Sequence, residues 1–193
     1  MGNQGRLEVT RASGKPAWIE LLAGDITEIS ADAIVNAANQ ELAGGGGVDG
    51  AIHRAAGPEL AAELRSRYRG CPTGSAVITG SGRLAEHGVS WIVHAVGPIW
   101  RGGTSGEEGL LASAYGTSLH LADQAGARSV ALPAISAGIY GYPLDEAARV
   151  ALSAVRDGLV RAHTIERAVF VLFDLDALGA FERALQTLGT RAR

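Results

Sequence analysis

The chain of 193 residues is 47% hydrophobic and 19% charged, which supplies one sizeable core and favours a single compact domain. Its formal net charge of −3 provides no strong positive field, so we do not expect it to hold a long nucleic-acid backbone. The single cysteine, Cys71, excludes an internal disulfide and is typical of a reducing compartment, which predicts a cytoplasmic location.

The first third of the chain predicts two strands and a pair of helices. Residues 1–16 form an N-terminal extension in which we expect an edge strand. Short apolar runs at residues 17–22 and 32–37 predict buried strands. Residues 51–69 carry apolar side chains at helical spacing, and Pro58 suits the first turn of a new helix, so this segment predicts a helix pair.

The middle of the chain continues this alternation. Runs rich in β-branched residues at 75–79 and 90–96 predict two strands. Residues 108–125 place leucine, alanine and tyrosine at helical intervals and predict a helix. A further strand is expected at residues 129–135.

The last third closes the predicted domain. A proline and two early carboxylates favour a helix from residue 143 toward residue 162. Residues 167–173 predict the final strand, and residues 177–188 predict a closing helix. We therefore expect one domain over residues 17–189 and a short tail at residues 190–193.

Strands that alternate with helices, and that are apolar on both faces, indicate a largely parallel sheet covered on two sides. The predicted fold is α/β, a three-layer α/β/α sandwich with a mixed, mostly parallel central sheet. Ligands of such sheets bind at the carboxyl ends of the strands. The unusual loops that follow the strands are therefore expected to share one face.

Two glycine-rich loops predict a site for a diphosphate. Four consecutive glycines, Gly44–Gly47, lie between a predicted strand and a helix, where backbone N–H groups can converge on an anion. A second loop, Ser136–Gly141, lies between a strand and a helix in the same way. The only lysine is Lys15, so recognition of phosphate falls to arginine or to backbone N–H groups.

Alternative interpretations of these loops remain. The first loop could be a flexible linker and the second a tight turn from strand to helix. Gly45, Gly47 and Gly50 also match the spacing of the dinucleotide fingerprint, which would indicate a nicotinamide-dependent oxidoreductase. That fingerprint requires an acidic residue after the next strand, and residues 64–85 contain neither aspartate nor glutamate.

Polar side chains flank the first loop. Asp49 is expected at the start of a helix, where the helix dipole would lower its pKa and keep it ionised, and His53 returns to the same helical face. Asp49 could then orient or deprotonate a water, while His53 holds Asp49 or takes up the proton. The plain alternative is a capping carboxylate beside a surface histidine. Asn36 is expected to brace the loop, and His94 to be a core residue whose polar atoms are satisfied.

Six blocks in order resemble the MacroD-type class of macrodomains. They are Gly24–Thr27, Asp32–Asn39, Gly44–His53, Cys71–Gly74, His94–Pro98 and Ser136–Pro143. The resemblance implies an ADP-ribose cleft, with activity on O-acetyl-ADP-ribose and on ADP-ribose esterified to protein carboxylates. Ala137 departs from the threonine common in relatives, which should alter little because that loop works through its amides.

The resemblance also implies roles for individual residues. Asp25 would accept from the adenine amino group, Phe173 would stack on adenine, and Asn39 would bind the distal ribose. The alternatives are a helix cap for Asp25 and a core position for Phe173. Asn39, Asp49 and His53 are the expected catalytic residues. The expected ligand-binding residues are Asp25, Ile26, Asn36, Gly45, Gly46, Gly47, Val48, Ser136, Ala137, Gly138, Ile139, Tyr140 and Phe173.

We therefore expect a hydrolase that removes an acyl ester from O-acetyl-ADP-ribose, or an ADP-ribosyl group from protein carboxylates, by attack of a water positioned by Asp49. Asp49 acts either as a general base or only as an anchor for a water that the diphosphate activates. The alternative function is a non-catalytic ADP-ribose reader. We expect a monomer with no metal, cofactor, membrane or nucleic-acid partner, whose partners are ADP-ribose, O-acetyl-ADP-ribose and mono-ADP-ribosylated proteins.

Overall fold

The computed structural model describes residues 5–191, along which strands and helices alternate. The strands are β1 (Arg6–Thr10), β2 (Pro16–Ala23), β3 (Ala33–Ala37), β4 (Ala76–Gly80), β5 (Trp91–Ala95), β6 (Ser129–Leu132) and β7 (Arg167–Leu172). The α-helices are α1 (Gly47–Ala56), α2 (Pro58–Arg67), α3 (Glu107–Gln124), α4 (Leu144–Arg161) and α5 (Leu175–Arg191). Two short 3₁₀ helices, η1 (Ile26–Glu28) and η2 (Gly82–His87), complete the described elements.

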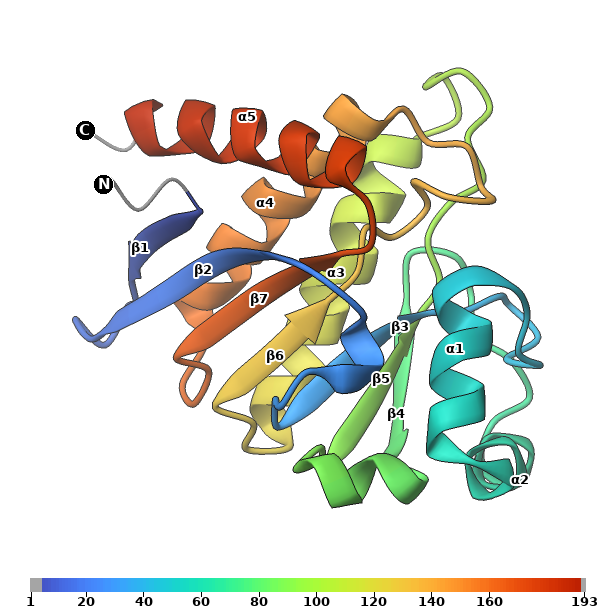
Figure 1. The fold of residues 1–193 in the computed structure, drawn as a ribbon. Coiled ribbons are helices and arrows are strands. Elements are labelled where there is room, and N and C mark those ends of the chain that lie inside the picture. The colour runs from blue at the N-terminus through green and yellow to red at the C-terminus, as the bar shows by residue number, and fades with distance from the viewer. Residues whose placement is uncertain (1–4, 192–193) are drawn as a thin grey trace.

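The strands form one sheet in the order β1-β2-β7-β6-β3-β5-β4 (Figure 1). The inner strands pair in parallel, from β2 through β7, β6 and β3 to β5. The two edge strands, β1 and β4, run antiparallel to their neighbours. The sheet is therefore mixed and mostly parallel, as the sequence predicted.

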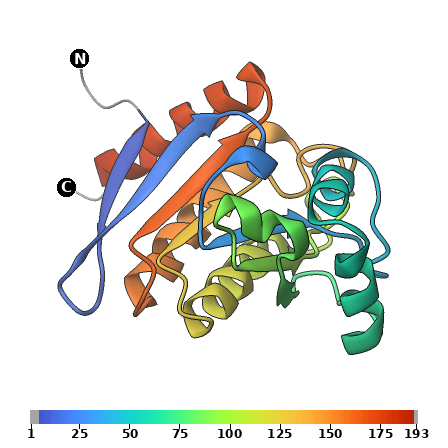
Figure 2. The ribbon, with the colours of Figure 1, turned by 60° about the horizontal axis from the view of Figure 1, so that its bottom comes forward.

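Helices cover both faces of this sheet (Figures 1 and 2). Alternate residues of β3 enter different clusters: Ala33 and Val35 pack with side chains of α3, α4 and α5, whereas Ile34 packs with those of α1 and α2. Because both faces of the strand are buried, the period-two polar pattern of a half-exposed strand is missing. The predicted three-layer α/β/α sandwich is confirmed.

The boundaries of some elements differ from the sequence predictions. Helix α1 begins at Gly47 rather than at residue 51, because the glycine loop closes directly onto its first turn and glycine gives no propensity signal there. Strand β6 ends at Leu132, since Pro133 has no backbone N–H for a ladder. Helix α5 continues to Arg191, so the tail expected from residue 190 begins inside a helix.

Tyr115 joins the helical layer to the loop after β6. Its hydroxyl donates to the carbonyl of Pro133 at 2.8 Å and accepts from the amide of Ile135 at 2.9 Å. The side chain is buried, and its ring meets that of Phe170 at 5.8 Å between centroids. This side chain from α3 therefore fixes the backbone that leads into the second glycine loop.

We predict that Tyr115→Phe lowers the free energy of unfolding by about 1–3 kcal/mol, because it removes two buried hydrogen bonds and leaves the Ile135 amide and the Pro133 carbonyl only their mutual contact at 3.0 Å. Urea unfolding followed by circular dichroism measures this change. Tyr142→Phe is the matched control, since the Tyr142 hydroxyl makes no hydrogen bond within residues 5–191. Equal stability of the two variants would contradict the proposed role of the Tyr115 hydroxyl.

Candidate functional site

The first glycine loop connects β3 to α1 and is folded by Asn39. The Asn39 amide donates to the carbonyl of Gly44 at 2.9 Å, and its oxygen accepts from the amide of Ala43 at 3.1 Å. The amide nitrogen keeps a second hydrogen and the amide oxygen a second lone pair, and both can bond another partner. The role of Asn39 as a ligand of the distal ribose stays a prediction. In the structure, its side chain also holds the loop together.

Glycine is required where this loop meets α1. A Cβ on Gly50 would lie 2.5 Å from the carbonyl oxygen of Gly45, which is backbone and cannot yield easily. A Cβ on Gly45 would lie 3.2 Å from Asp49 Oδ2. Gly44 and Gly47 have φ angles of +79° and +59°, which side chains other than glycine rarely adopt. The glycines thus bring the loop backbone against the Asp49 carboxylate.

The two oxygens of Asp49 have different surroundings. Oδ1 accepts from Asn36 Nδ2 at 2.7 Å and lies 3.4 Å from His53 Nε2. Oδ2 accepts no hydrogen bond within residues 5–191 and lies beside the Gly45 backbone. Asp49 is only 5% exposed. One oxygen is therefore anchored from the interior, while the other faces the glycine loop.

Burial raises the pKa of the Asp49 carboxyl above its ordinary value, and the Asn36 amide and His53 lower it only in part. This direction is opposite to the one predicted from the helix dipole alone. The reason is that Asp49 lies inside the protein rather than on an exposed first turn, and desolvation disfavours the charged form. The anchoring amide therefore favours the ionised form of Asp49.

Asn36 lies behind Asp49 and not in the loop. It is part of β3, where its register partner on β5 is His94, and it is 0% exposed. The expected contact of Asn36 with the ligand stays a prediction, whereas its side chain makes no hydrogen bond to the backbone of the loop in residues 5–191. Its amide instead holds Asp49, because the strand continues one residue beyond it and directs its side chain into the interior.

The second glycine loop lies next to the first. A Cβ on Gly46 would be 3.3 Å from Ile139 Cδ1, so the two loops approach within side-chain contact. Within the second loop, the amide of Tyr142 donates to the carbonyl of Ser136 at 3.0 Å, and Ser136 adopts a φ of 66°. A Cβ on Gly97 would overlap Ser136 Oγ. The end of β5 therefore supports this loop through close contact that only glycine allows.

Backbone donors gather where these loops meet. Among the described residues, 5–191, several loop amides donate to no other protein group, and they belong to both loops. They include the N–H groups of Gly45, Gly46, Gly138, Ile139 and Tyr140. Val48 follows Gly47 in the first turn of α1, where helical N–H groups have no partner within the helix. This arrangement can bind an anion without any lysine.

The residues expected to hold adenine lie at the ends of β2 and β7. Asp25 caps η1, because its Oδ1 accepts from the amide and hydroxyl of Thr27 at 2.9 and 2.7 Å. Ile26 is buried beneath it. Phe173 follows β7 and is 85% exposed, which excludes the alternative of a core phenylalanine. An exposed aromatic ring near a carboxylate is suited to a purine base.

The loop after β5 is ordered by a residue that the sequence analysis missed. The carboxylate of Glu107, 2% exposed, accepts from the amides of Arg101, Gly103 and Ser105 at 3.0, 3.2 and 2.6 Å. The amide of Trp100 donates to the carbonyl of Tyr140 at 2.9 Å, which joins this loop to the second glycine loop. In the sequence, only its position as a glutamate at the start of a predicted helix could have indicated this role for Glu107.

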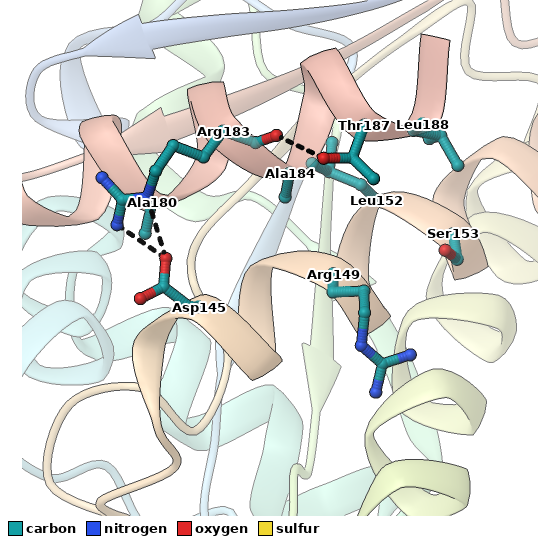
Figure 3. Close-up of a pocket in the computed structure, with 9 residues that line it drawn as sticks. All are labelled: Asp145, Arg149, Leu152, Ser153, Ala180, Arg183, Ala184, Thr187 and Leu188. Atoms are coloured by element: carbon teal, nitrogen blue, oxygen red, sulfur yellow. Dashed lines mark hydrogen bonds and ion pairs between the residues drawn. The ribbon is translucent and has the colours of Figure 1, made fainter. Parts of the chain in front are cut away.

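A groove of about 240 Å³ is lined by side chains of α4 and α5 alone (Figure 3). Its arginines are already paired: Arg183 with Asp145 at 2.6 Å, and Arg149 with Glu108 at 3.1 Å. We therefore place no phosphate site in this groove.

Two features are absent from residues 5–191. No cluster of three or more histidine, cysteine, aspartate or glutamate residues in this range could hold a metal ion. None of the described helices combines the length and the apolar content needed to cross a lipid bilayer.

Comparison with known proteins agrees with this geometry. Residues 35–151 match the model of the Macro domain family. An O-acetyl-ADP-ribose deacetylase of Citrobacter rodentium is 48% identical over 174 residues, which cover 89% of this chain and 97% of the relative. The family match spans both glycine loops.

Solved structures show the same fold. An Oceanobacillus iheyensis macrodomain with ADP has a TM-score of 0.85 at 36% identity, covering 96% of this chain and 97% of that one. A Trypanosoma brucei macrodomain in complex with ADP-ribose has a TM-score of 0.78 at 38% identity, covering 86% of this chain and 68% of that one. The resemblance inferred from the six sequence blocks is confirmed, and the chain belongs to the Macro domain family.

Proposed function

We propose that this protein binds ADP-ribose between its two glycine loops and hydrolyses an acyl ester on the distal ribose, with O-acetyl-ADP-ribose as the substrate. The observation that carries the proposal is the placement of Asp49. Its Oδ1 is anchored by Asn36, and its Oδ2 lies free beside the loop at Gly45. A relative that is 48% identical over 174 residues is named O-acetyl-ADP-ribose deacetylase.

Each part of the ligand matches a part of the site. The diphosphate takes the unpaired amides of the two loops, Phe173 stacks on adenine, and the free oxygen of Asp25 accepts from the adenine amino group. The distal ribose then lies toward Asn39 and Asp49. Backbone N–H groups suit this task in a chain of net charge −3, because they bind a local anion without creating a field that attracts polyanions.

The chemistry follows from the two oxygens of Asp49. Oδ2 accepts a hydrogen bond from a water and takes its proton as the water oxygen bonds to the acyl carbon. The resulting tetrahedral intermediate breaks its bond to the ribose oxygen, which leaves with that proton. The products are ADP-ribose and the free carboxylic acid. His53 Nε2 lies 3.4 Å from Oδ1, on the anchored side of the carboxylate.

The same site is suited to a second ester. A protein carboxylate joined to the distal ribose presents the same acyl carbon as an acetyl group does. We therefore propose mono-ADP-ribosylated glutamate and aspartate as further substrates, released by the same attack. A reader that binds ADP-ribose without turnover is the alternative function.

We predict that Asp49→Asn lowers turnover of O-acetyl-ADP-ribose by about 10²–10⁴-fold, the usual contribution of a positioned acid–base group. The affinity for ADP-ribose, measured by calorimetry, should stay close to that of the unmodified protein, because the diphosphate contacts are unchanged. Asp145→Asn, an exposed carboxylate in the α4–α5 groove, is the control. ADP-ribose binding by an unmodified protein that hydrolyses no ester would establish the reader instead.

The pH profile should report the raised pKa of Asp49. Because only the carboxylate can take the proton of the water, kcat/KM should fall as the pH drops through a pKa above the ordinary value of 3.8. Asn36→Leu, which removes the amide that favours the charged form, should move this limb to higher pH. Tyr140 and His53 are the other titratable groups near Asp49, so the limb must persist in Tyr140→Phe and His53→Gln. Its loss in either variant would assign it to that side chain.

Phe173→Ala should weaken ADP-ribose binding by about 1–3 kcal/mol, the range for stacking of one base on an aromatic ring. The side chain is 85% exposed, so the melting temperature should not change. Leu175→Ala, which removes a neighbouring side chain that is 78% exposed, is the matched control. Equal affinities of the two variants in calorimetry would contradict the stacking of adenine on Phe173.

A further inference from the structure

Three buried polar side chains lie in a row beneath α1. Asn36 and His94 are register partners on β3 and β5, and Val77 of β4 is the register partner of His94. Thr79 lies two residues beyond Val77 and therefore on the same face. Asn36, His94 and Thr79 are each 0% exposed, among apolar side chains that pack against α1 and α2.

The hydrogen bonds in this row have a fixed direction. The Thr79 hydroxyl donates its single hydrogen to the carbonyl of Gly80 at 2.9 Å. Its contact with His94 Nε2, also 2.9 Å, must then be one in which the imidazole donates. Burial and the nearby His53 lower the pKa of His94 to about 3, so the ring is neutral. The neutral ring with hydrogen on Nε2 has an unprotonated Nδ1 that can only accept.

His94 in turn orients the Asn36 amide. Asn36 Nδ2 has two hydrogens: one is directed at His94 Nδ1 at 3.1 Å and the other at Asp49 Oδ1 at 2.7 Å. The reverse orientation would place the amide oxygen against both the Nδ1 lone pair and the carboxylate. The observed orientation leaves Asn36 Oδ1 without a partner within residues 5–191, so the two donated bonds outweigh that cost.

We propose that Thr79 and His94 are positioning residues for the reaction, which fix the Asn36 amide so that it anchors Asp49 Oδ1 and leaves Oδ2 turned toward the glycine loop. This inference rests on the proposed function of Asp49. Thr79 lies three hydrogen bonds from Asp49, and His94 lies two. Their effect should therefore fall on turnover rather than on ADP-ribose binding.

The test removes the Thr79 hydroxyl while keeping the size of the side chain. In Thr79→Val the imidazole loses the acceptor for Nε2–H, and its hydrogen can move to Nδ1. There it would point at a hydrogen of the Asn36 amide, so that two donors face each other. We expect kcat for O-acetyl-ADP-ribose to fall about tenfold, as for a catalytic group moved from its productive position. The affinity for ADP-ribose should not change. Thr79→Ser, which keeps the hydroxyl, should restore kcat.

Ser118→Ala controls for the loss of a buried hydroxyl, because Ser118 is 0% exposed and donates only to the carbonyl of Ala114 within α3. Imidazole ¹⁵N NMR gives a second measurement: we expect the Nε2–H tautomer of His94 in the unmodified protein and its partial loss in Thr79→Val. The proposal is overturned if Thr79→Val keeps full kcat, if Thr79→Ser loses as much as Thr79→Val, or if the unmodified protein has hydrogen on Nδ1.

Failure of the proposed function gives a different pattern. If the unmodified protein binds ADP-ribose but hydrolyses no ester, the hydrolase proposal fails, while the side-chain amide resonances of Asn36 still test the positioning. A shift of these resonances in Thr79→Val, absent in Thr79→Ser and Ser118→Ala, would support the row of hydrogen bonds from Thr79 to Asp49. Unchanged Asn36 resonances would overturn it.

Discussion

The site depends on a buried carboxylate with two unequal oxygens. Burial raises the pKa of Asp49, and a bond from Asn36 at 2.7 Å opposes this. Because that bond comes from the interior of the sheet, it also determines which oxygen remains free. A single hydrogen bond thus favours the charged form and fixes the direction of the group proposed to activate water. The glycines around Asp49 then allow the loop backbone to come close to the free oxygen.

In the proposed function, recognition of the ligand rests on backbone geometry rather than on cations. Unpaired amides of two loops lie close together, as the approach of Ile139 to Gly46 shows. Both loops are held from outside the site: Tyr115 fixes the backbone before Ser136, and Asn39 folds the loop after β3. Rigid support of this kind lowers the cost of ordering the loops when a diphosphate binds.

Much of this arrangement could be predicted from the sequence. The alternation of apolar runs and helical spacing gave the sandwich, and the glycine clusters with Asp49 indicated the loops that meet at the site. The environment of Asp49 could not be predicted, because its pKa depends on burial that only the folded chain shows. The neighbours of Asn36 could not be predicted for the same reason: only the pairing of β3 with β5 reveals that His94 lies beside it. Thr79 gave no signal at all, since a threonine in a strand is ordinary.

The most direct test of the account is a crystal structure of the protein with ADP-ribose. We predict that the diphosphate lies between the amides of Gly45–Gly46 and Gly138–Tyr140, and that the distal ribose faces Asp49 Oδ2 while Oδ1 remains bonded to Asn36. A diphosphate bound elsewhere, or a distal ribose out of reach of Oδ2, would contradict it.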